Sequence, residues 1–201
     1  MATEILCIID KSGSMGPALD DHIGGFNTFL RQQKKLEGGD ETAFSLMLFN
    51  QDYENIYTGP LADAPELDES NYVPSGMTAL FDAVAAGLCL ISARVATEYA
   101  QGTDVQVIIA ILTDGQENMS REIKLPDLTK MIKAAESSNW TFHFLSSDMD
   151  SWDDAEAMGL SKSFTSTHGQ SVRQTYAKLG TVISINRNQN RNRKPPMGTE
   201  T

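Results

Sequence analysis

Cysteine and histidine are scarce in this chain of 201 residues. Its two cysteines, Cys7 and Cys89, stand among core-type residues without metal-ligand spacing, so we expect two buried, reduced thiols, in agreement with a reducing cytoplasm. The three histidines, His22, His143 and His168, are isolated in sequence, and none accompanies a familiar nucleophile motif. The sequence therefore gives no support to a catalytic triad.

The chain also lacks segments that would direct it to a membrane. It begins Met1-Ala2-Thr3-Glu4 and enters a short apolar segment, without a basic region or a small-residue cleavage site. No stretch approaches the roughly 18 uninterrupted apolar residues expected of a membrane span. We therefore expect a soluble, cytoplasmic protein without membrane partners.

Basic residues are in deficit, with 16 Lys and Arg against 27 Asp and Glu, which gives a formal net charge of -11. This charge disfavours nonspecific binding to nucleic acid or anionic membranes and favours cations and basic partners. The C-terminal segment is the exception, because Arg187, Arg191, Arg193 and Lys194 lie there among Asn, Gln and Pro. We expect residues 186–201 to form a flexible basic tail, the one part suited to touch nucleic acid.

Length and patterning predict a single α/β domain over residues 1–185. The apolar runs 4–9 and 105–112 are typical of central parallel strands that helices cover on both faces. Segments 43–49 and 53–57 predict a hairpin, which places one antiparallel strand at an edge. The expected fold is a Rossmann-like, doubly wound and mainly parallel sheet.

Amphipathic segments separate the predicted strands. Leu80, Val84, Leu88, Ile91 and Val95 recur at helical spacing, the strongest such signal in the chain, and Thr78 stands at its start. Further helices are predicted at about 17–36, 126–138, 151–158 and 171–185, short strands at 140–145 and near 164, and a loop at 61–72.

Both predicted central strands end near an aspartate. Asp10 closes the first strand, and Asp114 follows the strand 105–112. In a doubly wound sheet the functional crevice lies beyond the carboxyl ends of the strands, where the strand order reverses. We therefore expect both carboxylates at one crevice.

Three motifs occur in order around this predicted crevice. The first strand is followed by Asp10-Lys11-Ser12-Gly13-Ser14, a D-x-S-x-S pattern, and then come S-G-M-T at 75–78 and L-T-D-G at 112–115. Together they resemble a von Willebrand factor A (vWA) domain with its metal-ion-dependent adhesion site (MIDAS), of the stand-alone bacterial or phage type. The resemblance spans about residues 3–185. It implies a divalent cation held by Asp10, Ser12, Ser14, Thr78 and Asp114.

The resemblance also implies a role for each residue. Ser12 and Ser14 would bind the ion directly, Asp10 and Asp114 would act mainly through water, and Thr78 would do either. Oxygen donors suit Mg²⁺, with Mn²⁺ or Ca²⁺ as alternatives. A mostly neutral set of ligands leaves the cation electrophilic, with one position for an Asp or Glu carboxylate from a protein partner. The implied function is an adhesion or assembly module that is not an enzyme.

Other interpretations stay open. The acid and hydroxyl side chains could cap two helices, which is compatible with ligation. The protein could be structural, with a vestigial or stabilising ion site. A Mg²⁺-dependent phosphatase of the haloacid-dehalogenase type also has an aspartate after its first strand, but its second acid would fall at Ser12.

Residues near the motifs have two interpretations each. Met15, Met77 and Met119 could form an apolar rim for a partner, with Met15 the preferred rim residue, or they could pack beneath the loops. Glu117 and Asn118 could face the crevice or belong to a solvated loop. Neither is predicted to be a ligand.

Overall fold

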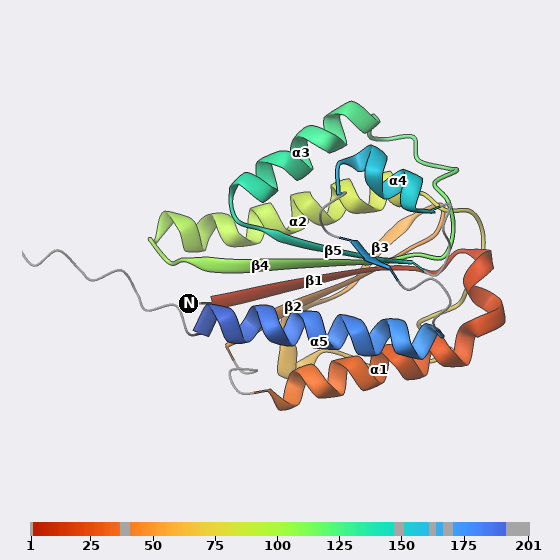
Figure 1. The fold of residues 1–201 in the computed structure, drawn as a ribbon, viewed down its shortest axis with the longest axis horizontal. Coiled ribbons are helices and arrows are strands. Elements are labelled where there is room, and N and C mark those ends of the chain that lie inside the picture. Colours follow the sequence, from red (N-terminus) through yellow and green to blue (C-terminus); the bar gives the residue numbers. More distant parts are fainter. Residues whose placement is uncertain (1, 37–40, 147–150, 161–163, 167–170, 192–201) are drawn as a thin grey trace, which may run out of the picture.

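A computed structural model describes residues 2–36, 41–146, 151–160, 164–166 and 171–191. Its sheet is sandwiched between two layers of helices, with α2, α3 and α4 on one face and α1 and α5 on the other (Figure 1). The helices are α1 (Leu19–Lys35), α2 (Leu80–Ala100), α3 (Leu125–Ser137), α4 (Ser151–Met158) and α5 (Val172–Arg191).

Within the described residues the sheet has six strands in the order β3-β2-β1-β4-β5-β6, and of these only β3 is antiparallel to its neighbour β2. The predicted doubly wound, mainly parallel sheet with one antiparallel edge strand is therefore confirmed. The strands are β1 (Ala2–Asp10), β2 (Thr42–Phe49), β3 (Tyr53–Pro60), β4 (Val105–Leu112), β5 (Thr141–Ser146) and β6 (Phe164–Ser166).

The strand order reverses at β1, whose neighbours are β2 on one side and β4 on the other. Register places Asp10 opposite Phe49 and Ile9 opposite Leu112, so β1, β2 and β4 end at the same edge of the sheet. This edge is where a doubly wound fold forms its crevice. The loops that carry the predicted site leave the sheet there.

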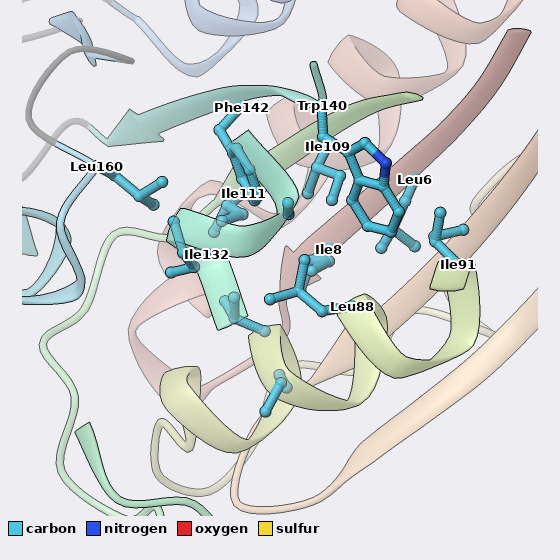
Figure 2. Close-up of a cluster of buried hydrophobic side chains, with 14 of the residues drawn as sticks. Leu6, Ile8, Leu88, Ile91, Ile109, Ile111, Ile132, Trp140, Phe142 and Leu160 are labelled. Atoms are coloured by element: carbon cyan, nitrogen blue, oxygen red, sulfur yellow. The ribbon is translucent and has the colours of Figure 1, made fainter. Parts of the chain in front are cut away.

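Two hydrophobic cores flank β1, because successive side chains of a strand point to opposite faces. Leu6 and Ile8 face α2, where Figure 2 shows them close to Leu88 and Ile91. Their neighbours Ile5, Cys7 and Ile9 belong to the core beneath α1 and α5. Burial on both faces explains why this strand is almost wholly apolar.

α2 is long and apolar enough, by length and composition, to cross a membrane, but half of its apolar stretch is buried inside the protein. Its buried residues include Leu80, Val84, Leu88, Ile91 and Val95, which pack in the core between α2 and the sheet. These are the residues whose spacing predicted the helix. The apolar composition of α2 is thus that of a core helix.

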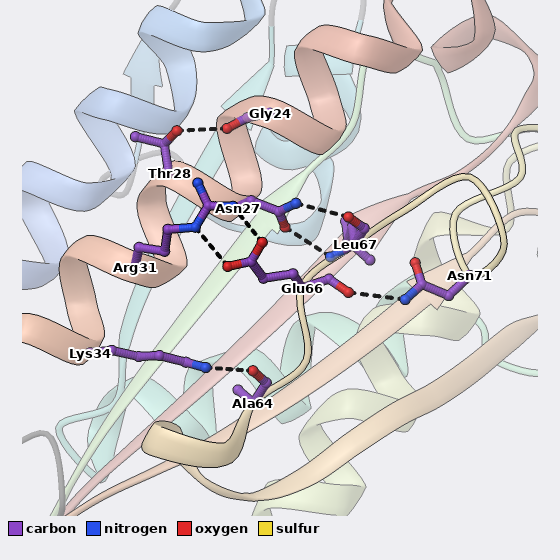
Figure 3. A network of polar contacts seen from close by, with 9 residues as sticks. All are labelled: Gly24, Asn27, Thr28, Arg31, Lys34, Ala64, Glu66, Leu67 and Asn71. Carbon is purple, nitrogen blue, oxygen red and sulfur yellow. Dashed lines mark hydrogen bonds and ion pairs between the residues drawn. The ribbon is translucent and has the colours of Figure 1, made fainter.

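The predicted loop at 61–72 has one short 3₁₀ turn, η2 (Leu61–Asp63), and is fastened to α1. The Asn27 amide donates to Leu67 O and accepts from Leu67 N, both at 2.8 Å, and Lys34 Nζ donates to Ala64 O at 2.7 Å (Figure 3). Arg31 Nε donates to Glu66 at 2.6 Å. This loop leads into Tyr72, which reaches the candidate site.

Two boundaries differ from the predictions. The helix predicted to begin near residue 17 is preceded by a 3₁₀ helix, η1 (Gly13–Ala18). The last helix, predicted to end at residue 185, continues to Arg191. The helix α5 therefore includes residues 186–191 of the segment that was predicted to form a tail. The remainder of that segment, 192–201, lies outside the described residues.

A buried arginine explains the longer helix. Arg187 is 3% exposed, and its guanidinium donates to Gln33 O at 2.9 Å and to Thr42 Oγ1 at 3.2 Å. These bonds fasten the end of α5 to α1 and β2. The segment 186–191 has no apolar periodicity, so the sequence carried no sign of this anchor.

The two cysteines differ in burial. Cys7 is fully buried in β1, as predicted, and burial raises the pKa of its thiol far above the usual range. Cys89 is exposed on α2, so the prediction of a buried thiol there was wrong. It lies between the buried Leu88 and the half-buried Leu90, a neighbourhood that resembles a core position in sequence.

Candidate functional site

Asp10, at the end of β1, is the most deeply buried acid of the site, with no exposed surface. Its Oδ1 accepts from Ser12 N and its Oδ2 from Thr113 Oγ1, both at 2.6 Å. Tyr72 Oη donates to the backbone oxygen of Asp10 at 2.7 Å. Burial raises the pKa of Asp10 to about 6, while the bonds from Thr113 and Ser12 lower it.

Two serine hydroxyls lie next to this carboxylate. Ser12 is 2% exposed, and its Oγ is 3.0 Å from Ser14 Oγ. Ser14, which is exposed, donates to Asp114 Oδ1 at 2.7 Å. The loop after β1 is thereby joined to the loop after β4 through side chains 100 positions apart in sequence.

Thr78 brings a third hydroxyl from the segment before α2 and is 3% exposed. A Cβ built on Gly115 would lie 3.2 Å from Thr78 Oγ1, 3.3 Å from Ser14 Oγ and 3.8 Å from Ser12 Oγ. The three hydroxyl oxygens therefore surround a space that the missing side chain of Gly115 leaves free. The structure thus brings all five predicted residues to one place.

The donor set fits a small, hard cation. Ligands about 2.0–2.1 Å from Mg²⁺ in an octahedron are about 2.9 Å apart along an edge. The observed oxygen pairs, Ser12 with Ser14 at 3.0 Å and Ser14 with Asp114 at 2.7 Å, lie close to that spacing. Asp10, Ser12 and Thr78 are buried, whereas Ser14 is exposed, so the site is accessible from solvent on the side of Ser14.

The helix-capping alternative finds no support in these loops. Ser12 precedes η1 and Ala79 precedes α2, and neither position makes a capping hydrogen bond through its side chain. Ser12 Oγ is directed at Ser14 instead. Thr78 lies one residue before the position that would cap α2.

Backbone bonds hold the loop of Thr78 against the loop of the serines. Gly13 N donates to Gly76 O at 3.1 Å, and Ser75 N donates to Lys11 O at 2.9 Å. Gly76 has a φ of +76°, and a Cβ there would lie 1.6 Å from Gln51 Oε1. Because glycine adopts a positive φ without steric cost, this backbone conformation explains the glycine of the S-G-M-T motif.

Asn118 supports Thr78, a role that sequence reasoning missed. Its Oδ1 accepts from Thr78 N at 2.9 Å, and its own N donates to Thr78 O at 3.0 Å. Both polar groups of the Thr78 backbone are therefore bound by one residue of the loop after β4. Asn118 therefore holds the backbone of the threonine in place.

Glu117 supports the same loop. Its carboxylate accepts from Phe81 N at 2.9 Å, Met119 N at 2.8 Å, Ser120 N at 2.7 Å and Ser120 Oγ at 2.6 Å. Phe81 N belongs to the first turn of α2, where amides lack partners within the helix. Glu117 thus acts as a clamp that joins this loop to α2. Neither sequence interpretation, a residue that faces the crevice or one in a solvated loop, describes this role.

The prediction of Met15 as the preferred rim residue was wrong. Met15, the preferred rim residue, is 1% exposed and packs beneath the loops, whereas Met77 is 54% exposed. Met119 is half-buried. Met15 follows Ser14 within η1 and is the buried residue of that 3₁₀ helix. Within the described part of the chain, no three His, Cys, Asp or Glu side chains form a metal cluster, so an ion here would depend on the hydroxyls.

The architecture is that of the vWA fold, and comparison with solved structures agrees. The vWF domain of the type V pili tip protein Mfa5 from Porphyromonas gingivalis has a TM-score of 0.64 at 11% identity, covering 92% of this chain and 96% of that one. The ArnB paralog VWA2 from Sulfolobus acidocaldarius has a TM-score of 0.54 at 19% identity, covering 90% and 44%. Similarity at these identities shows the fold alone.

The pilus adhesin SpaC from Lactobacillus rhamnosus GG, in its open conformation, gives a TM-score of 0.68 at 16% identity. The match covers 92% of this chain but only 30% of SpaC, so the chain corresponds to one part of that larger protein. No protein-family model and no curated protein sequence matches the chain.

Proposed function

We propose that this chain is a divalent-cation-dependent binding module, in which Asp10, Ser12, Ser14, Thr78 and Asp114 hold Mg²⁺ and a partner's carboxylate completes the site. The observation that carries the proposal is the convergence of three hydroxyl oxygens, from two separate loops, on the space beside Gly115. Neutral hydroxyl oxygens line this space, while the carboxylate of Asp10 lies beneath it and the carboxylate of Asp114 lies beside it.

The proposed roles of the five residues follow from their burial and hydrogen bonding. Ser12, Ser14 and Thr78 would bind the ion, while Asp10 orients the Ser12 loop through its backbone amide and Asp114 orients the Ser14 hydroxyl. Bound Mg²⁺ would supply a Lewis-acidic position for an anionic oxygen. Because Ser14 is the exposed member, the external oxygen would enter on its side.

Binding is a better-supported role for this site than catalysis. A haloacid-dehalogenase-type phosphatase requires a second acid two residues after its first aspartate, and Ser12 occupies that position with its hydroxyl directed at Ser14. A pilus adhesin and a pilus tip protein share the fold, which accords with an adhesion or assembly role. The module would act without turnover.

A selection from random peptides tests the proposal even though the natural partner is unidentified. The chain is immobilised in Mg²⁺, a phage-displayed random peptide library is applied, and bound phage are eluted with EDTA. We expect the eluted sequences to be enriched in Asp or Glu. The double variant Ser12→Ala with Ser14→Ala should lose this EDTA-eluted fraction, because it lacks two of the three hydroxyls.

Two serines at the end of α3 provide the matched control. Ser137 and Ser138 bond only to backbone oxygens of their own helix through their hydroxyls, so Ser137→Ala with Ser138→Ala should recover the same acidic peptides as the wild type. Equal recovery by the Ser12/Ser14 variant, or eluted peptides without acidic enrichment, would refute the proposal. Binding that persists in EDTA would favour the structural alternative.

A further inference from the structure

Exposed apolar side chains gather beside the candidate site. In the described part of the chain, the two most exposed large hydrophobic residues are Val73 at 57% and Met77 at 54%. Both belong to the segment that carries Thr78. We call Val73 and Met77 the apolar rim.

The segment that carries the rim is held rigidly. Asn50 accepts from Ala79 N through its backbone oxygen at 2.7 Å and donates through its amide to Ser75 O at 3.0 Å. Met77 N donates to Gln51 Oε1 at 3.3 Å. Further bonds from Lys11 and Gly13 hold the segment on its other side. The rim side chains are therefore exposed on a fixed scaffold, where a partner can contact them without ordering a loop.

The rim borders the hydroxyl site. Met77 immediately precedes Thr78, and the residue after Val73, Pro74, lies 3.9 Å from the position of a Cβ on Gly16 in the serine loop. The segment that carries Val73 and Met77 therefore lies alongside the serine loop. A chain whose carboxylate reaches the hydroxyl site would place its neighbouring side chains over these residues.

The charge of the protein restricts which side chains can lie beside the partner's carboxylate. The chain has a net charge of -11, so electrostatic repulsion disfavours an approaching segment with several acids relative to one with a single acid. The rim segment 73–77, V-P-S-G-M, has no charged residue. Apolar contact is independent of this repulsion, and exposed apolar patches on rigid scaffolds are typical of protein interaction sites.

We infer that the partner segment presents a single acidic residue with bulky uncharged apolar residues directly beside it, and that Val73 and Met77 receive those apolar side chains. This inference rests on the proposed function and adds the sequence context of the captured carboxylate. The acid gives cation dependence, and the rim selects among the many acidic segments that a cell contains.

The test compares short peptides of defined sequence, blocked at both ends and densely coated on a sensor surface in Mg²⁺. One has aspartate between leucines, one has aspartate between serines, and one has asparagine between leucines. We expect about ten-fold tighter retention of the chain on the leucine-flanked aspartate than on the serine-flanked aspartate, because partial burial of a leucine side chain is worth about a factor of ten. The asparagine peptide should not retain the chain.

Substitution of the rim should erase this preference. Val73→Ser with Met77→Ser should retain both aspartate peptides equally, at the level of the serine-flanked one. Ile185→Ser is the control, because Ile185 is 49% exposed on α5 and lies far from the candidate site. Its neighbour Asn186 bonds to Gln106 near the start of β4, at the end of the sheet opposite the site. It should keep the ten-fold preference. All variants should have the wild-type melting temperature.

The outcomes separate the inference from the function beneath it. Equal retention of the two aspartate peptides by the wild type, or a preference that survives the rim substitutions, overturns the inference and leaves carboxylate capture standing. Retention of the asparagine peptide shows apolar binding without the ion and overturns the inference. Failure of both aspartate peptides to bind in Mg²⁺ overturns the proposed function and the inference together.

Discussion

Replacement of Glu117 by alanine tests the clamp that joins the loop after β4 to the first turn of α2. The substitution removes a carboxylate that accepts four hydrogen bonds, three of them from backbone amides. One of these amides, Phe81 N, lies in the first turn of α2. Its loss resembles the loss of a helix cap, which costs about 1 kcal/mol.

The remaining bonds add to this cost. Glu117 is half-buried, so water replaces part of what the amides of Met119 and Ser120 lose, and each contributes about 0.5–1 kcal/mol. The free energy of unfolding should therefore fall by about 2–3 kcal/mol. For a domain of this size that corresponds to a melting temperature lower by about 5–10 °C.

Thermal unfolding of Glu117→Ala against Glu122→Ala provides the assay. Glu122 lies in the same loop, and its carboxylate accepts a single bond, from Tyr53 Oη at 2.9 Å, so its replacement should change stability by less than about 0.5 kcal/mol. A Mn²⁺ titration of the folded variants should show weaker binding only for Glu117→Ala. If both variants melt within about 2 °C of the wild type, which corresponds to less than about 1 kcal/mol, the clamp does not exist as described.

Three further substitutions test the fold. Burial lowers the pKa of His22 to about 4 from its usual value of 6.5, so the unfolded state binds more protons between these pH values and the stability declines as pH falls from 6.5 to 4. In urea unfolding at about pH 8 and pH 5, His22→Phe should show a smaller loss of stability at the lower pH than the wild type. An equal loss in both proteins would count against this role of His22. Gly25→Ala should lower the free energy of unfolding by about 1–3 kcal/mol, because the added Cβ would lie 2.5 Å from Tyr176 Cδ2. Gly24→Ala is the control and should not destabilise the protein, because its Cβ would lie 3.8 Å from the nearest neighbour. Equal melting temperatures of the two variants would contradict this packing. Arg187→Ala should lower stability by about 2–4 kcal/mol by freeing the end of α5 from α1 and β2, and a change below about 0.5 kcal/mol would mean that the anchor is unimportant.

Much of the fold is predictable because the relevant signals are local. The run from Glu4 to Ile9 is apolar on both faces, and this identifies β1 as a central strand. The spacing from Leu80 to Val95 identifies α2 in the same way. The end of α5 was not predictable, since Arg187 stabilises it through contacts with α1 and β2 that no local pattern encodes.

The candidate site was also predictable only in part. Asp10, Ser12, Ser14, Thr78 and Asp114 follow from three short motifs at the ends of predicted elements, and the structure brings them together. The supporting residues could not be found in this way. Glu117 and Asn118 act through backbone amides of a segment about 40 positions away, and any loop residue with an oxygen could have that role. The D-G-Q-E-N sequence after β4 was the only signal, and it fitted solvent equally well.

The most direct test of the central claim is a crystal structure of the chain grown in Mn²⁺, with anomalous data collected at the manganese edge. We expect a single strong anomalous peak within about 2.1–2.3 Å of the hydroxyl oxygens of Ser12 and Ser14 and close to Thr78, at a site that Mg²⁺ can also occupy. An anomalous map without a peak there, or hydroxyls that point away from one another in the presence of the ion, would contradict it.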